Sequence, residues 1–155
     1  MFKLRHSVKK GNKGFSLVEL IIVIAIMVAL IAVMGPQYIK YVSNSRDAVV
    51  TQAAQDVLAV VKAEVNLGHL IFADNVNEGS VTVGPENGNG KVRVTLSNGL
   101  MYDDNGSTDF EAICGVDETK IVKSDLKYII RITGNDISAH PELVSIEMES
   151  TESGD

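Results

Sequence analysis

The chain has 155 residues, of which 20 are acidic and 14 are basic, and its formal net charge is −6. This length allows one membrane-spanning helix and one small domain. The excess of acid argues against direct nucleic-acid binding, which depends on lysine and arginine placed against phosphates. Cys114 is the only cysteine, so an intrachain disulfide is excluded and the redox compartment cannot be inferred from it.

Residues 1–14 are predicted to be a basic leader that is cleaved from the mature protein. They contain five basic residues and no acidic one. A secretory signal peptide has its apolar stretch before the cleavage site, whereas here the apolar stretch follows Gly14. Cleavage after Gly14 would therefore leave the membrane anchor in place. It would also leave 9 of the 14 basic residues against 20 acids, a side-chain charge of −11.

Residues 15–39 are predicted to form a transmembrane helix. From Leu20 to Ile39 there are 20 residues without a charged side chain, and as a helix they span about 30 Å, the thickness of the hydrocarbon core. The lysine and arginine excess before this helix predicts a single pass with a cytoplasmic N-terminus. An uncleaved signal anchor is the alternative interpretation.

Glu19 lies just inside the apolar segment and is expected to need a cationic partner. An acidic residue deep in a membrane helix costs about 3 kcal/mol, less near the end. The helix dipole returns at most about 1 kcal/mol to a carboxylate in the first turn. A free amine on Phe15, created by cleavage after Gly14, would supply the missing charge.

Gly35 and Pro36 predict a kink or a loosened segment, because proline lacks the amide donor and clashes with the preceding turn. Beyond them, residues 40–68 are predicted to be the amphipathic half of the same helix. Apolar residues recur there at three- and four-residue steps, which indicates one face for a sheet and one for water or neighbours. Gly68 suits a C-terminal cap.

Residues 69–148 are predicted to form a globular head, an antiparallel sheet of about four strands packed on the helix, which makes the fold class α+β. Asn98 and Gly99 favour a tight hairpin from the preceding strand into residues 100–102. The acidic tail, residues 149–155, is expected to be disordered. The predicted strands, rich in β-branched residues, are 80–83, 91–96, 127–133 and 143–149.

The sequence contains few side chains arranged for catalysis or cofactor binding. It therefore predicts a protein that is not an enzyme and has no cofactor. The three histidines are far apart, and Cys114 is better explained as a small buried side chain than as a nucleophile. An oxygen-rich segment offers candidate calcium ligands, but its spacing does not fit an EF-hand loop, so an acidic solvated turn without metal is favoured. These candidates are Asp103, Asp104, Asn105 and Asp109.

The stretch Lys13-Gly14-Phe15-Ser16-Leu17-Val18-Glu19-Leu20, its apolar continuation and Pro36-Gln37-Tyr38 resemble the N-terminus of a type IVa pilin, over roughly residues 10–50. The resemblance implies the pilin fold, a long N-terminal helix packed on an antiparallel sheet. It also implies that a prepilin peptidase cuts between Gly14 and Phe15 and methylates the new amine. In that family the acid matching Glu19 is thought to pair with the N-terminal amine of a neighbouring subunit.

Two features depart from the family pattern. Many pilins of Gram-negative bacteria close the C-terminal region with a disulfide, which a single Cys114 cannot form. Many relatives also carry glycine where this chain has Val28. The predicted flexible point falls instead at Gly35 and Pro36.

The resemblance implies a structural subunit of a type IV pilus that polymerises with other pilin subunits. An assembly ATPase and a platform protein would lift it from the cytoplasmic membrane into an extracellular filament, and adhesion, motility or DNA uptake would be properties of the fibre. The alternative is a pseudopilin of a type II secretion or competence system. An alternative of another class is a monomeric membrane-anchored binding protein with an intact Met1.

Overall fold

The structure is a computed structural model that describes residues 14–97, 99–103, 110–116, 121–135, 137 and 140–152. It contains two compact units, Met1–Lys40 and Tyr41–Asp155. The predictions made for residues 1–13 of the leader lie outside the described residues.

One long helix, α1 (Leu17–Leu67), accounts for the predicted transmembrane and amphipathic segments. Its C-terminus closes in a Schellman motif around Gly68, which has the left-handed φ of 78° that glycine accepts without strain. The Gly68 N–H donates to the Val65 carbonyl at 3.1 Å, and the His69 N–H donates to the Glu64 carbonyl at 3.1 Å. The predicted cap at Gly68 is therefore confirmed.

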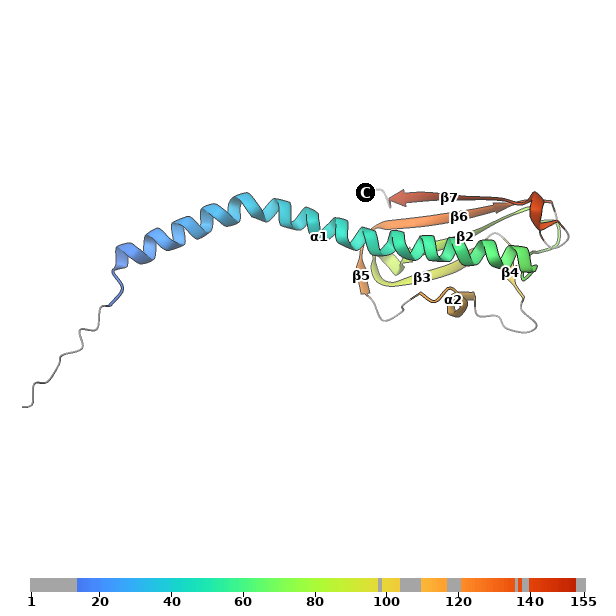
Figure 1. Ribbon diagram of the computed structural model, residues 1–155, viewed down its shortest axis with the longest axis horizontal. Helices are drawn as coiled ribbons and strands as arrows, with labels where there is room; N and C mark the ends of the chain where they lie inside the picture. Colours follow the sequence, from blue (N-terminus) through green and yellow to red (C-terminus); the bar gives the residue numbers. More distant parts are fainter. Residues whose placement is uncertain are drawn as a thin grey trace, which may run out of the picture. The chain divides into compact units, whose positions relative to one another are not determined.

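The head unit contains, in its described part, two antiparallel sheets and the short helix α2 (Phe110–Ile113) (Figure 1). The larger sheet has five strands in the order β5-β3-β2-β6-β7, and the smaller one pairs β1 with β4. The strands are β1 (Leu70–Phe72), β2 (Glu78–Pro85), β3 (Asn89–Ser97), β4 (Leu100–Tyr102), β5 (Ile121–Lys123), β6 (Leu126–Thr133) and β7 (Ser145–Glu152). Two 3-10 turns, Glu86–Gly88 and Pro141–Leu143, complete the described elements.

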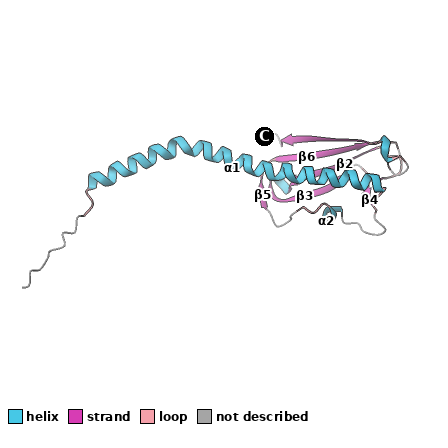
Figure 2. Cartoon of the chain, viewed as in Figure 1, coloured by secondary structure: helices cyan, strands magenta, loops and turns pink. Residues whose placement is uncertain are grey.

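The core of the head lies between α1 and one face of the five-stranded sheet. Figure 2 shows the C-terminal half of the helix lying along the sheet. The buried positions of α1 recur at three- and four-residue steps and are Val50, Ala54, Val57, Val61, Glu64 and Val65. The sheet contributes alternate residues, as expected for a strand with one buried face: Val81, Val83, Val92, Val94, Val122, Ile130 and Ile132. The predicted α+β fold, a long helix packed on antiparallel strands, is confirmed.

Hydrogen bonds from hydroxyl groups connect α1 to the sheet at Asp47 and Thr51, near the start of its buried face. The buried Ser124 hydroxyl donates to the Asp47 carboxylate at 2.6 Å, and it also accepts the Leu126 N–H at 3.1 Å. The Thr51 hydroxyl donates to the Asp47 carbonyl at 2.9 Å and lies 3.0 Å from the Tyr128 hydroxyl, which is then the donor of that second bond. These bonds fix the register of the helix along β6.

The large sheet has five strands, close to the predicted number of about four, and the short β5 adds three residues to the edge of β3. Two other details of the predicted head are wrong. The expected hairpin at residues 98–99 does not form: β4 pairs with β1, with Leu70 opposite Tyr102, and Asn98 lies outside the described residues. The acidic tail was expected to be disordered from Glu149, but β7 pairs with β6 as far as Glu152.

The close approach of β2 to β4 gives a prediction for stability. A Cβ added at Gly79 would lie 2.7 Å from Leu100 Cβ and 3.1 Å from Phe72 Cε1, so Gly79→Ala overpacks the junction of the two sheets. We expect a loss of about 1–3 kcal/mol, measured by urea unfolding in detergent. Gly35→Ala is the control, because a methyl group there meets no atom within 4 Å. Equal stability of the two variants would contradict this packing.

Candidate functional site: the capped apolar segment

The N-terminal part of α1 exposes an unbroken apolar surface. From Leu17 to Met34 the large apolar side chains are between 51% and 73% exposed. Among the described residues, α1 is the one helix that is long and apolar enough to cross a membrane, and its apolar window is not buried in the chain. A soluble core helix would be mostly covered by its own domain. This surface therefore requires lipid or other protein to cover it.

Glu19 forms the carboxylate half of a capping box at the start of this helix. Its Oε2 accepts the Ser16 backbone N–H at 3.0 Å, and the Leu20 N–H donates to the Ser16 carbonyl at 3.2 Å. Ser16 is the N-cap and Glu19 the third helical residue, the Ser-x-x-Glu spacing of that motif. The carboxylate also lies in the first turn, where the helix dipole favours negative charge.

The capping bond gives Glu19 a hydrogen-bond donor within its own chain, while the cationic partner expected for its charge stays a prediction. A first donor is already supplied in the same chain, and the signal for it was the Ser16-Leu17-Val18-Glu19 spacing itself. The bond satisfies one oxygen but adds no positive charge. Within the described residues no contact is formed by Oε1, so the carboxylate retains capacity for a second donor.

Gly14, Phe15 and Ser16 lie outside the helix. Phe15 is 90% exposed, and a Cβ added at Gly14 would meet no atom within 4 Å. None of the other described residues therefore covers the Gly14–Phe15 peptide bond. Cleavage there and methylation of Phe15 remain predictions.

The helix assignment continues through Gly35 and Pro36 without a break. The missing amide of Pro36 still removes one hydrogen bond from the ladder. The kink predicted at these two residues stays a prediction.

The calcium prediction concerns residues that are mostly not described. Asp103 is exposed and its N–H donates to the His69 carbonyl at 2.8 Å, whereas Asp104, Asn105 and Asp109 lie outside the described residues. Within the described part of the chain, no group of three or more His, Cys, Asp or Glu side chains is placed to hold a metal ion.

Cys114 is buried in the core of the head, which gives a second prediction. Burial, and then the charges of Glu111 and Glu64, raise the pKa of the Cys114 thiol to about 12. Because the thiolate is the reactive form, we expect alkylation by iodoacetamide at pH 8 to be at least about a hundredfold slower in the folded chain than in urea. Equal rates would contradict the burial.

The raised pKa of Cys114 also determines how the stability of the head changes with pH. The folded pKa lies above the ordinary value of 9.0, so the stabilisation from the protonated thiol is complete below pH 9 and is lost as the pH rises towards 12. In Cys114→Val, the loss of stability that this thiol causes between pH 9 and pH 12 should be absent from the free energy of unfolding.

Comparison with known proteins adds one finding about the N-terminal segment. The family model described as the prokaryotic N-terminal methylation motif matches residues 9–35. This range includes the Gly14–Phe15 bond, the capping box and the apolar surface. No solved structure matches the chain significantly. The match shows that residues 9–35 carry the prepilin signal found in type IV pilins and pseudopilins.

Proposed function

We propose that the chain is a structural subunit of a type IV pilus, cut by a prepilin peptidase between Gly14 and Phe15 and methylated on the new Phe15 amine. The observation that supports this most is the exposed apolar helix with its capped Glu19, which lies within the matched methylation motif. The folded head supplies a separate compact unit for the outside of the filament.

Membrane anchoring and polymerisation use the same apolar surface. In water, burying it against other subunits stabilises by about 25 cal/mol per Å². In the membrane that gain is largely absent, because lipid tails cover the surface equally well. Extraction therefore has to be driven, which is the physical reason for an assembly ATPase and a platform protein as partners.

The proposed role of Glu19 combines two partners. The Ser16 N–H holds Oε2 within the subunit, and the methylated amine of a neighbouring Phe15 approaches the remaining oxygen when the helix is packed in the filament. That amine keeps a basic pKa near 8 and is cationic at neutral pH. Two charges in a low dielectric attract strongly, but only a close contact offsets their desolvation.

Mass spectrometry of the native N-terminus, combined with electron microscopy of the cell surface, tests this proposal. A chain that begins with methylated Phe15 and is found in surface filaments supports it. A chain that keeps Met1 and stays monomeric overturns it in favour of a membrane-anchored binding protein. The pseudopilin alternative shares the matched motif, and it predicts methylated Phe15 without long surface fibres.

A further inference from the structure

The two edges of the five-stranded sheet differ, and the β5 edge is largely closed. β5 has only three residues and pairs with residues 89–91 of β3. Further along β3, the Val94 N–H donates to Glu111 Oε1 of α2 at 3.3 Å. A very short edge strand and a covering helix are two ways in which proteins keep an edge from pairing with another chain. This edge therefore offers little room for a further strand.

The opposite edge of the sheet is β7, which is long and open. Its eight residues pair with β6 along their full length. Among the described residues, no strand pairs with its other side. Alternate residues of such an edge strand direct their N–H and C=O groups outwards, where another extended chain can pair with them. The backbone of β7 therefore offers a site for strand addition.

The core side of β7 favours an apolar partner. Ile146 and Met148 point to this side, where they pack against the core but stay partly exposed. An added strand would place alternate side chains on the same side, next to these two residues. Apolar side chains at those positions would remove the remaining apolar surface of the edge from water, which is favourable.

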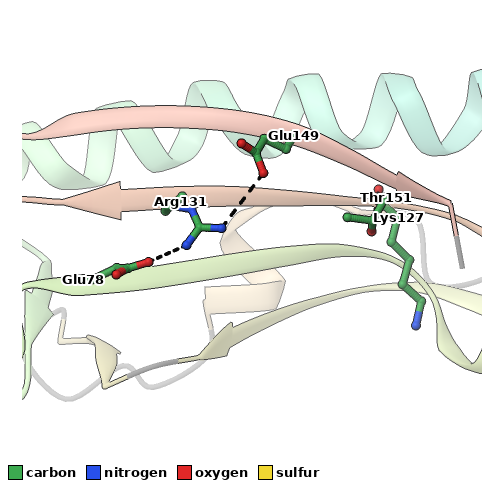
Figure 3. A network of polar contacts seen from close by, with 5 residues as sticks. All are labelled: Glu78, Lys127, Arg131, Glu149 and Thr151. Carbon is green, nitrogen blue, oxygen red and sulfur yellow. Dashed lines mark hydrogen bonds and ion pairs between the residues drawn. The ribbon is translucent and has the colours of Figure 1, made fainter.

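The outer side of β7 favours basic residues. Glu147 and Glu149 are exposed there, and β7 contains no basic residue. Figure 3 shows Arg131 of β6, which binds Glu78 at 2.5 Å and reaches Glu149 at 4.0 Å. Lys127 lies on the same strand as Arg131, so both cations are one strand spacing, about 5 Å, inside the edge. The row of side chains nearest the open edge is therefore acidic.

A second copy of this chain is a poor partner for the β7 edge. Two β7 strands side by side would bring Glu147 and Glu149 close to the same carboxylates of the other copy, and like charges opposite each other are destabilising. After the proposed cleavage the chain would also carry 20 acids against 9 of its 14 basic residues. The charge of the edge therefore selects against copies of this chain and in favour of a basic segment.

We infer that β7 binds an extended segment of another protein, which adds to the sheet as a further strand. The bound segment carries lysine or arginine at the alternate positions beside Glu147 and Glu149. The positions between them carry apolar residues, which lie beside Ile146 and Met148. In this mode of recognition backbone hydrogen bonds supply the affinity, and the alternating side chains supply the selectivity. The inference goes beyond the proposed function, since it depends only on the folded head.

Peptides of defined pattern test this docking on the full-length chain in a non-ionic detergent, with empty micelles as the blank. The probe is a labelled synthetic peptide of alternating lysine and valine with the length of β7. One comparison peptide has the same composition in two blocks, a second has N-methylated amides and lacks the backbone donors, and a third has glutamate in place of lysine. Fluorescence anisotropy measures binding, and hydrogen exchange locates the bound peptide.

We expect the alternating basic peptide to bind at least about tenfold more tightly than each comparison peptide, because only this peptide combines backbone pairing with opposite charge. Amides of β7 should exchange more slowly in the complex, whereas those of β5 should be unchanged. Equal binding of the block peptide or the N-methylated peptide overturns strand addition, since charge alone would then explain the binding. Protection elsewhere in the chain, or no binding by any peptide, also overturns it.

Charge reversal at one residue tests the acidic row. Glu147→Lys should weaken binding of the alternating basic peptide about fivefold, the upper range for one surface ion pair, and should strengthen binding of the glutamate peptide. Asp56→Lys is the matched control with unchanged binding, because it makes the same change of charge at an exposed position of α1. Thermal unfolding of both variants checks that the head is folded.

Two further outcomes would contradict the docking. Equal weakening by Glu147→Lys and Asp56→Lys would mean that the peptide responds to the overall charge of the chain, which overturns the assignment to β7. A concentration-dependent dimer of the original chain that protects the β7 amides without peptide overturns the choice of partner and assigns the edge to a second copy.

Discussion

Replacing Glu19 with glutamine is expected to lower the yield of filaments at least tenfold while the start of the helix stays intact. Glutamine at this position still accepts the Ser16 N–H, because the capping box works with Glu or Gln. The variant therefore removes the charge and keeps the cap. Breaking a buried ion pair leaves the partner unpaired and costs about 3–5 kcal/mol. Sheared filaments are measured, with mass spectrometry to check that Phe15 is still the N-terminus.

Glu19→Ala is the matched comparison, since it removes the charge and the cap together. Loss of the cap should cost about 1 kcal/mol at the helix start, visible as faster hydrogen exchange of the first amides in detergent. Normal filament yield from Glu19→Gln would show that the charge is dispensable. If only Glu19→Ala fails to polymerise, the essential role of Glu19 is the capping bond and not the amine.

Replacing Ile130 with alanine is expected to destabilise the head by about 2–5 kcal/mol, the largest effect predicted for a single change in this unit. Ile130 is fully buried on the face of β6 that packs against α1. Its neighbour Ile129 lies on the outer face, where it is partly exposed. Ile129→Ala should therefore cost less than Ile130→Ala, because a partly exposed side chain loses fewer packing contacts.

Urea unfolding of the full chain in detergent measures this difference between two adjacent isoleucines. The comparison is sharp because the two residues share a strand and a chemical change and differ only in the face that they occupy. A larger loss from Ile129→Ala than from Ile130→Ala would mean that the strand is turned over in solution and that the register of β6 is wrong.

The sequence predicted best where the pattern is long and the cause is local. The apolar run from Leu20 to Ile39 and the three- and four-residue steps after residue 40 predicted one helix, and α1 covers both. Gly68 predicted the cap, because a left-handed position there favours glycine. The Ser16–Glu19 spacing carried equally local information, because it is the spacing at which a Glu side chain reaches the N-cap N–H.

The pairing of short strands could not be predicted, because it depends on which edges are free in the folded head. Residues 98–99 suggested a local hairpin between β3 and β4, but no such pairing is present among the described strands. β4 instead pairs with β1, whose three residues gave no distinct signal of their own.

The acidic tail is a second segment whose structure could not be predicted from the sequence. Charge density near the C-terminus favoured disorder, but the backbone of β7 pairs with β6 along eight residues. Thr151 adds a hydroxyl bond to the Lys127 carbonyl at 3.4 Å. Neither the partner strand nor this bond can be inferred from the composition of the tail.

The capping box has one more consequence, for the enzyme that would remove the leader. A protease has to seat the bond it hydrolyses in an accessible stretch of backbone, and a peptide bond within a helix must first be unwound at a cost in free energy. Because the helix begins only at Leu17, the Gly14–Phe15 bond is presented without that unwinding. The anchor can stay rigid in the bilayer during hydrolysis, and the turnover rate is then independent of how stable the helix is.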